Sequence, residues 1–146
     1  MYLIIKRVTD IVMSLAGLIV LSPLFLWLTI WTKLDSDGPV LFRQKRAGKD
    51  REAFYMLKFR TMTLYAPKEC PTNLLEDPDK YITKAGKFLR KTSLDELPQL
   101  VNILKGEMSV IGPRPALFNQ HDLLEHRDKV NANSIRPGLT GWAQVN

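Results

Sequence analysis

An uncharged stretch near the start of the chain, from Ile11 to Thr32, limits what this sequence can fold into. It is mostly apolar and meets the length of about 20 residues that a helix needs to cross a hydrocarbon core of about 30 Å. Ser22-Pro23 stands in its middle, and proline removes a backbone donor and clashes with the carbonyl four residues earlier. We therefore expect a break there. Each half then has about ten residues, or about 15 Å of helix, which is too short to span a bilayer alone.

The charges on both sides of this stretch help to predict its topology in a membrane. Lys6 and Arg7 precede it and Lys33 follows it, so positive charge does not bias one side. A kinked spanning helix and a re-entrant hairpin, which enters and leaves by the same leaflet, both remain open, and the balanced charge favours the hairpin. A cleaved signal peptide is disfavoured, because no small-x-small site follows the apolar run. Asp10 lies three residues after Arg7, and we expect a local ion pair between them.

The overall composition predicts one modest domain with an anionic partner. The chain has 146 residues and a formal net charge of +6, which indicates an anionic partner without identifying it. Cys70 is the only cysteine, so an intramolecular disulfide is excluded, and a reducing cytoplasmic setting fits. No Cys/His cluster has the spacing of a zinc site, and no phosphate-binding glycine motif or Ser/His/Asp arrangement is present.

After residue 35, periodicity predicts short strands and amphipathic helices, a mixed and helix-rich α/β pattern. Residues 63–78 lose this periodicity and contain several prolines, which predicts a surface loop. His121 and His126 fall in a polar helix, where surface positions are expected for both. The expected strands are Val40–Phe42, Phe54–Phe59 and Met108–Ile111, with Lys45–Arg51 connecting the first two, and the expected helices are Asp79–Lys91 and Leu117–Val130.

A further helix is expected at the start of the stretch Thr92–Pro115. Ser93 and Glu96 have the spacing of a capping box, and Gly106 can end the helix. Asp95 and Glu96 then lie in the first turn, where the helix dipole favours carboxylates and also a nearby phosphate or metal–phosphate group. Acidic residues are common in first turns, so this motif alone favours an ordinary helix start. The apolar stripe predicted for this helix consists of Leu94, Leu97, Val101 and Leu104.

Two basic residues flank Phe59 in the second expected strand. Lys58 and Arg60 would project to the same face, because side chains alternate along a strand. Two cations on one face favour an anion, although solvated charges on an edge strand explain the pattern equally well.

Five blocks, taken together and in order, are more specific than any one of them. They are the broken apolar segment with Ser22-Pro23, Lys58-Phe-Arg-Thr-Met62, Ser93-Leu-Asp-Glu-Leu97, Gly112-Pro-Arg-Pro115, and the final segment from Arg136 to Asn146. Together they resemble the bacterial sugar transferase family, the monotopic phosphoglycosyl transferases. The resemblance runs over nearly the whole chain. It implies a membrane enzyme that moves a sugar-1-phosphate from a UDP-sugar to polyprenol (undecaprenyl) phosphate, releasing UMP, as a first membrane step of exopolysaccharide, lipopolysaccharide or related glycoconjugate assembly.

The resemblance also implies roles for individual residues. The aspartate of the Asp-Glu pair, which maps to Asp95, would be the nucleophile that forms a phosphosugar–enzyme intermediate. Glu96 would be the second member of this pair, and Mg²⁺ would bind beside the two carboxylates. The residues expected to bind phosphates or nucleotide are Lys58, Arg60, Arg90, Arg114 and Arg136. This set is chemically reasonable, because a diphosphate can approach an anionic nucleophile only if cations offset the repulsion.

These implications complete the expected organisation. Residues 1–35 would form the re-entrant membrane hairpin, and residues 36–146 would form a catalytic domain on the cytoplasmic face of the bacterial inner membrane. Family members continue past the final block, so we expect the catalytic domain to extend beyond residue 146. The partners would be a UDP-sugar, polyprenol phosphate and inner-membrane lipid, with a homo-oligomer left open and no nucleic acid.

Two alternatives come from other classes. The net charge and the basic residues between Arg43 and Arg60 would suit a membrane-anchored module that binds nucleic acid or anionic lipid. However, the basic residues of this sequence are not interleaved with aromatic residues that could stack on bases, and a binding module would leave the Asp95-Glu96 pair unexplained. A magnesium-dependent phosphohydrolase would use the same carboxylates and arginines but transfer the phosphoryl group to water.

Overall fold

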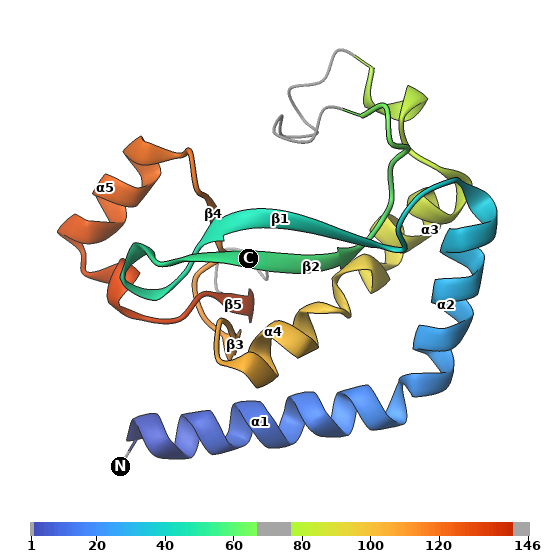
Figure 1. Ribbon diagram of the computed structural model, residues 1–146. Coiled ribbons are helices and arrows are strands. Elements are labelled where there is room, and N and C mark those ends of the chain that lie inside the picture. Colours follow the sequence, from blue (N-terminus) through green and yellow to red (C-terminus); the bar gives the residue numbers. More distant parts are fainter. Residues whose placement is uncertain (1, 67–76, 142–146) are drawn as a thin grey trace. The chain divides into compact units, whose positions relative to one another are not determined.

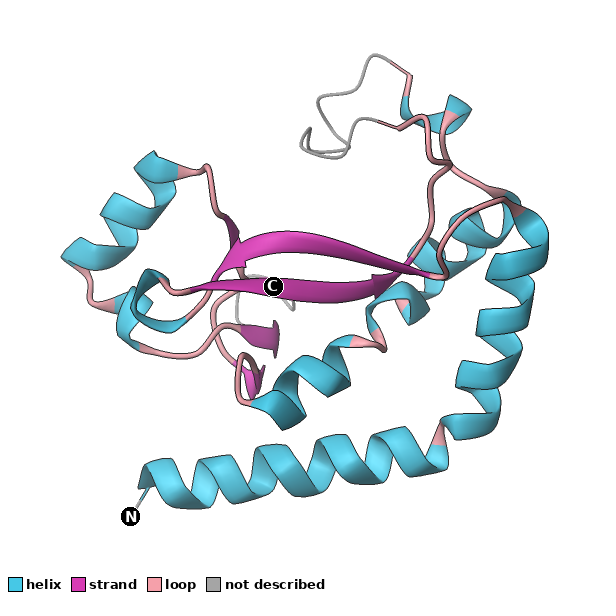
Figure 2. Cartoon of the chain, in the orientation of Figure 1, coloured by secondary structure: helices cyan, strands magenta, loops and turns pink. Residues whose placement is uncertain are grey.

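The computed structural model describes residues 2–66 and 77–141. Within them the chain forms two compact units, and each is built from segments that are distant in sequence. Unit 1 contains residues from Met1–Val20, Arg43–Leu57 and Gln99–Asn146, and unit 2 contains Leu21–Phe42 and Lys58–Pro98. Most of the expected 63–78 loop, including Cys70, and the end of the final block lie outside the described residues. Helices and strands are mixed, as the sequence predicted (Figure 2).

The N-terminal segment forms two helices with a break, as expected. Helix α1 covers Tyr2–Val20 and helix α2 covers Ser22–Asp35 (Figure 1). The break is the single residue Leu21, and Pro23 lies in the first turn of α2, where a missing N–H costs no helical hydrogen bond. Among the described residues no single helix is long and apolar enough to cross a membrane, whereas α1 and α2 meet those criteria only as a pair, bent by 64° at the break.

A long β-hairpin follows, and it is longer than predicted. Strand β1 covers Leu41–Ala47 and strand β2 covers Ala53–Phe59, joined by a 3₁₀ turn at Lys49–Arg51. The expected connection Lys45–Arg51 is wrong at its start, because residues 45–47 continue β1, where Arg46 and Ala47 pair with a third strand. That strand, β4 at Ala116–Leu117, is antiparallel to β1, with Arg46 opposite Leu117. Among the described residues the order in this sheet is β2-β1-β4, so β2 is an edge strand there.

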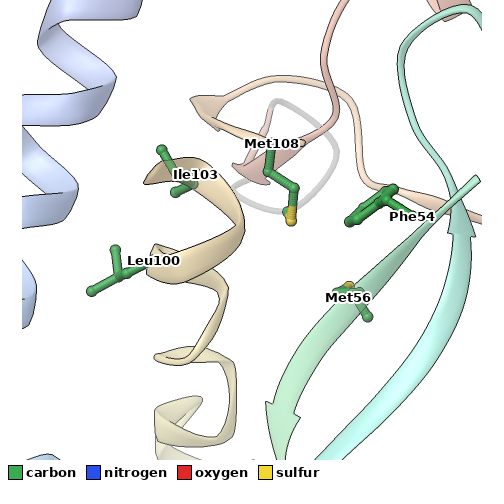
Figure 3. Close-up of a cluster of buried hydrophobic side chains, with 5 residues drawn as sticks. All are labelled: Phe54, Met56, Leu100, Ile103 and Met108. Carbon is green, nitrogen blue, oxygen red and sulfur yellow. The ribbon is translucent and has the colours of Figure 1, made fainter. Parts of the chain in front are cut away.

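The core of unit 1 lies between β2, helix α4 and the start of strand β3. Helix α4 covers Gln99–Lys105, β3 covers Ser109–Ile111, and β3 pairs in parallel with β5 at Gly138–Thr140. The largest buried cluster consists of Phe54, Met56, Leu100, Ile103 and Met108 (Figure 3). Helix α1 packs against α4 and β3.

Helix α5 covers His121–Lys129 and begins later than predicted, since Leu117 belongs to β4. His121 and His126 are exposed, as expected.

A buried amide joins α4 to the edge of the hairpin. Asn102 is fully buried, and its Oδ1 accepts a hydrogen bond from the Leu57 N–H at 3.0 Å. Its Nδ2 donates to the Tyr55 carbonyl at 2.9 Å and to Glu107 Oε2 at 2.6 Å. The side chain therefore bonds the backbone of edge strand β2 as a neighbouring strand would.

Polar contacts of α1 differ from the ion pair that we expected. Asp10 is buried and accepts hydrogen bonds from Ser109 Oγ and from the Val110 N–H, both at 3.0 Å. Lys6, not Arg7, is its cationic neighbour, at 3.8 Å. Arg7 instead donates to the carbonyls of Ile103 and Leu104 near the end of α4. The expected Arg7–Asp10 pair is therefore wrong. The last carbonyl groups of α4 have no partner within their own helix and accept hydrogen bonds from Arg7, which the local sequence pattern cannot show.

Unit 2 is built around three fully buried side chains, Leu28, Phe59 and Leu89. They come from α2, from the end of β2 and from helix α3, which covers Lys84–Thr92. The predicted helix from residue 79 begins late, because Pro78–Lys80 forms a separate 3₁₀ turn and the Thr83 side chain caps α3 by accepting from the Gly86 N–H.

The predicted helix from Ser93 is also wrong. Ser93 has a φ of 57° and ends α3 in the left-handed conformation, and its side chain makes no cap hydrogen bond. Leu94–Glu96 forms a 3₁₀ turn, and α4 begins only at Gln99, after Pro98. Pro98 has no N–H to bond the Leu94 carbonyl, so the α-helical pattern cannot run through it. The expected apolar stripe is divided accordingly: Leu94 and Leu97 pack in the core of unit 2, whereas the buried residues of α4 are Gln99, Leu100, Asn102 and Ile103.

Candidate active site

The two carboxylates predicted for the active site, Asp95 and Glu96, lie in the 3₁₀ turn that follows α3 in unit 2. Asp95 is the one buried residue of this turn, with 9% of its surface exposed, and Glu96 beside it is partly buried. Lys58, at the end of β2, contacts both. Its Nζ lies 2.6 Å from Glu96 Oε1 and 4.0 Å from Asp95 Oδ2. The structure thus brings together three of the predicted site residues, which are separated by up to 38 positions in sequence.

Burial controls the charge state of Asp95. Loss of hydration raises the pKa of its carboxyl, and the charge of Glu96 raises it further. Lys58 and Arg90 oppose this shift because they stabilise the carboxylate, as does a backbone hydrogen bond. A nucleophile in this position keeps less of its hydration than an exposed aspartate, so its ionised form is more reactive and depends on the adjacent cations.

Arg90, in the last turn of α3, is the second cation near Asp95. Its Nε donates a hydrogen bond to Thr61 Oγ1 at 2.9 Å. Burial lowers the pKa of Arg90, while the charge of Asp95 raises it. A guanidinium has a pKa far above neutrality, so Arg90 stays charged and can offer planar N–H donors to a phosphoryl group at Asp95.

Arg60 and Lys58 were expected on one face of the strand, but their side chains bind different partners. The Arg60 guanidinium is buried, and Nη2 donates to the carbonyl of Thr32, to the carbonyl of Ser36 and to Ser36 Oγ. Loss of hydration lowers the pKa of Arg60, and the charges of Asp37 and Asp35 oppose this shift. Arg60 therefore binds the C-terminal end of α2, whereas Lys58 binds the carboxylates.

The remaining predicted cations, Arg114 and Arg136, are exposed residues of unit 1. Arg136 Nε donates to the Gly106 carbonyl at 2.7 Å. Their two segments meet beside the β3–β5 pair, where the Gly112 N–H bonds the Thr140 carbonyl at 3.0 Å and the Gly138 N–H bonds the Pro113 carbonyl at 2.9 Å. The structure therefore joins the Gly112–Pro115 block to the Arg136 block within one unit.

A family of known proteins matches the sequence along its whole length. The family model described as bacterial sugar transferase matches residues 1–146. The chain belongs to this family. The resemblance expected from the five sequence blocks is therefore confirmed.

Several relatives in the family have functional names. A UDP-glucose:undecaprenyl-phosphate glucose-1-phosphate transferase of Escherichia coli is 40% identical over 98% of this chain and 31% of its own length. A UDP-N-acetylgalactosamine-undecaprenyl-phosphate N-acetylgalactosaminephosphotransferase of Aeromonas hydrophila is 40% identical over 99% of this chain and 34% of its own. The exopolysaccharide production protein PSS of Rhizobium leguminosarum is 40% identical, with 75% of its length covered. This chain thus spans about a third of the first two relatives and three quarters of the third.

The magnesium ion that the resemblance implies would have two carboxylates available in this turn, Asp95 and Glu96. No group of three or more His, Cys, Asp or Glu side chains that could enclose a metal occurs in residues 2–66 and 77–141. Mg²⁺ usually keeps several waters and binds one or two carboxylates plus substrate phosphate oxygens, so a complete protein cage is not required. Asp95 and Glu96, adjacent in one turn, fit that kind of site.

Thr61 contacts the site, and our sequence reasoning gave it no role. It lies within the Lys58–Met62 block, where only the basic residues drew attention. The sequence offered only one indication of a role for Thr61, a hydroxyl group three residues after Lys58. This spacing is too common in proteins to identify a functional residue. Only the fold places it against Arg90.

Proposed function

We propose that the protein transfers a sugar-1-phosphate from a UDP-sugar to polyprenol phosphate, giving UMP and polyprenol diphosphate sugar. The observation that carries this proposal is the buried Asp95 carboxylate with Lys58 and Arg90 as its cationic neighbours. The names of relatives support the two substrates, since they include UDP-glucose, UDP-N-acetylgalactosamine and undecaprenyl phosphate. The exopolysaccharide name of the Rhizobium relative supports a role in building surface polysaccharides.

The chemistry that we propose has two steps. A carboxylate oxygen of Asp95 attacks the phosphorus that carries the sugar, a bond forms between them, and the bond to the bridging oxygen breaks so that UMP leaves with the electron pair. In the second step a phosphate oxygen of polyprenol phosphate attacks the same phosphorus and releases the Asp95 carboxylate. Covalent catalysis of this kind divides one difficult displacement into two easier ones.

Each neighbouring side chain has a defined task in these steps. Lys58 and Arg90 offset the repulsion between Asp95 and the diphosphate and stabilise the charge on the transferring phosphoryl oxygens. Glu96 holds Lys58 through the 2.6 Å ion pair and so fixes its ammonium beside Asp95. Mg²⁺, bound through the carboxylates, would supply further charge neutralisation to the diphosphate and the leaving group.

The two-step route is tested by a single-turnover experiment without polyprenol phosphate. The full chain, Mg²⁺ and a UDP-sugar labelled in the sugar should release up to one equivalent of UMP and retain label on the peptide that contains Asp95. Asp95→Asn should abolish both signals, because an amide is too poor a nucleophile to attack phosphorus. Asp79→Asn, at an exposed position of the same unit, is the matched control and should behave as wild type.

Three results would change the proposal. Label retained by the Asp95→Asn protein would move the nucleophile elsewhere. UMP release that requires both substrates would replace the two-step route by direct transfer. Free sugar phosphate formed continuously in water, without dependence on polyprenol phosphate, would identify the protein as a phosphohydrolase.

We also propose that α1 and α2 enter the inner membrane as a re-entrant hairpin, with both ends on the cytoplasmic face. Support comes from the break at Leu21 and from exposed apolar side chains on α2, where Leu26, Trp27 and Ile30 are each at least 50% exposed. Such side chains would be costly in water but suit a lipid environment.

This topology is tested by labelling cysteines at the two ends of the hairpin. In a Cys70→Ser background, which removes the native thiol, Leu3→Cys and Ser36→Cys should react only with reagents added from the cytoplasmic side. Replacing Ser22 and Pro23 by Ala and Leu should extend the helix and move the first end to the outside. Labelling of Leu3→Cys from the outside in the protein that keeps Ser22 and Pro23 would establish a spanning helix.

A further inference from the structure

Thr61 is a buried polar residue at the edge of the candidate active site. Only 8% of its surface is exposed. Its backbone carbonyl accepts a hydrogen bond from the Thr83 N–H at 3.1 Å, and the N–H of the preceding residue, Arg60, bonds the Val40 carbonyl at 2.8 Å. The backbone around Thr61 is therefore fixed on both sides, which gives its hydroxyl a defined position.

A glycine allows α3 to approach this residue. Gly86 is buried in the first turn of α3, and a Cβ at this position would lie less than 3.0 Å from the Thr61 carbonyl oxygen and carbon. Backbone atoms cannot move aside as a flexible side chain can. Only glycine at position 86 therefore permits the observed distance between α3 and Thr61.

Arg90 follows Gly86 by four residues and so lies on the same face of α3. That face contacts Thr61 twice, by close backbone approach at Gly86 and by the 2.9 Å hydrogen bond from Arg90 Nε to Thr61 Oγ1. An arginine side chain has several rotatable bonds, and a hydrogen bond at Nε restricts both the position and the plane of the guanidinium. Its Nη groups project beyond Nε, so the bond also sets the direction in which they point.

We propose that Thr61 is a positioning residue, whose hydroxyl, fixed against α3 through Gly86, orients the Arg90 guanidinium toward the phosphoryl group carried by Asp95. This inference rests on the function proposed above. Thr61 itself does not contact the reacting atoms. It acts through Arg90, whose donors must be aligned before the reaction to stabilise the transition state.

The contact can be tested without any substrate. In the ¹⁵N-labelled full chain, the Arg90 Nε–Hε signal, assigned by its loss in Arg90→Lys, should exchange slowly with water. Thr61→Val, which keeps the shape of threonine but removes the hydroxyl, should speed this exchange at least tenfold, and Thr61→Ser should restore slow exchange. Equal exchange in wild type and Thr61→Val would overturn the inference whatever the protein catalyses.

The consequence for the reaction is tested by single-turnover UMP release in a double-mutant cycle. Thr61→Val should lower the rate about 10-fold to 100-fold, the scale of one hydrogen bond to a charged group, and Thr61→Ser should stay within about threefold of wild type. In an Arg90→Ala background, Thr61→Val should change the rate by less than about twofold, because the residue it positions is absent. Thr63→Val, two residues along the chain, is the matched control and should leave the rate unchanged.

The outcomes separate this inference from the proposed function. If Thr61→Val lowers the rate equally in both backgrounds, Thr61 has a merely structural role and the inference is wrong. If wild type releases no UMP from any UDP-sugar but the Arg90 signal responds to Thr61 as predicted, the contact stands and the proposed reaction fails.

Discussion

Replacing Lys58 by methionine tests how this site keeps its nucleophile ionised. Methionine has a similar length and no charge, so Lys58→Met removes the ammonium that lies 4.0 Å from Asp95 and 2.6 Å from Glu96. Burial and the charge of Glu96, which both raise the pKa of Asp95, would then be opposed mainly by Arg90 and the backbone. We expect the acid limb of the pH–rate profile to move to higher pH in Lys58→Met.

The size of this effect follows from the distance and the burial. Two unit charges 4.0 Å apart attract by about 1 kcal/mol in bulk water and by about 4 kcal/mol at an effective dielectric constant of about 20. The side chains of Lys58 and Asp95 are only 18% and 13% exposed, which favours the middle of this range after allowance for screening. A loss of about 2 to 3 kcal/mol would lower the ionised fraction of Asp95 on the acid limb by about 30-fold to 150-fold.

The assay is single-turnover UMP release measured from acid to alkaline pH. Lys58 would also stabilise the phosphoryl group directly, so Lys58→Met should lower the alkaline plateau as well as move the limb. Lys58→Arg keeps the charge and is the matched control, with a limb close to that of wild type. An acid limb at the same pH in wild type and Lys58→Met would refute the reasoning, because it would show that Lys58 does not support the ionised form of Asp95.

Three further changes have distinct expected outcomes. Burial raises the pKa of Asp95 in the folded state, so the free energy of unfolding should fall as the pH rises through that pKa. Asp95→Asn should remove this fall, and the variant should therefore melt at a higher temperature than wild type near pH 8. Arg90→Ala should lower the rate of UMP release by about 10²-fold or more; near-normal turnover would remove Arg90 from the site. Asn102→Ala should reduce the free energy of unfolding by about 1 to 3 kcal/mol in urea titrations, because it removes the partner of two part-buried backbone groups, the Tyr55 carbonyl and the Leu57 N–H. A change below about 0.5 kcal/mol would contradict this role.

Features governed by local chemistry could be predicted from the sequence. The break between α1 and α2 follows from the backbone chemistry of Pro23. The two hairpin strands were expected from short apolar and aromatic runs, although β1 continues past the expected Phe42 to Ala47. Local spacing also placed Asp95 and Glu96 together in one turn, although the expected α-helical first turn is a 3₁₀ turn.

Other features depend on contacts between distant segments and leave little trace in a local pattern. Ser93 and Glu96 have capping-box spacing, but the left-handed conformation of Ser93 serves the end of α3 instead of the start of a helix. Arg7 and Asp10 are spaced for an ion pair, yet each finds a buried partner from α4 or β3. Asn102 and Thr61 are ordinary polar residues in sequence, and their importance comes from which backbone or side chain the fold places beside them.

The close approach of Gly112 and Gly138 limits how members of this family could be recombined. A Cβ at either glycine would lie less than 3.0 Å from backbone atoms of the other segment, and β3 and β5 hydrogen-bond on both sides of this point. The Gly112–Pro115 block and the segment 136–140 therefore have to be exchanged together, although twenty residues separate them in the printed sequence. A chimera that takes residues 109–115 from one sugar transferase should fold only if residues 136–140 come from the same parent or preserve the same backbone spacing.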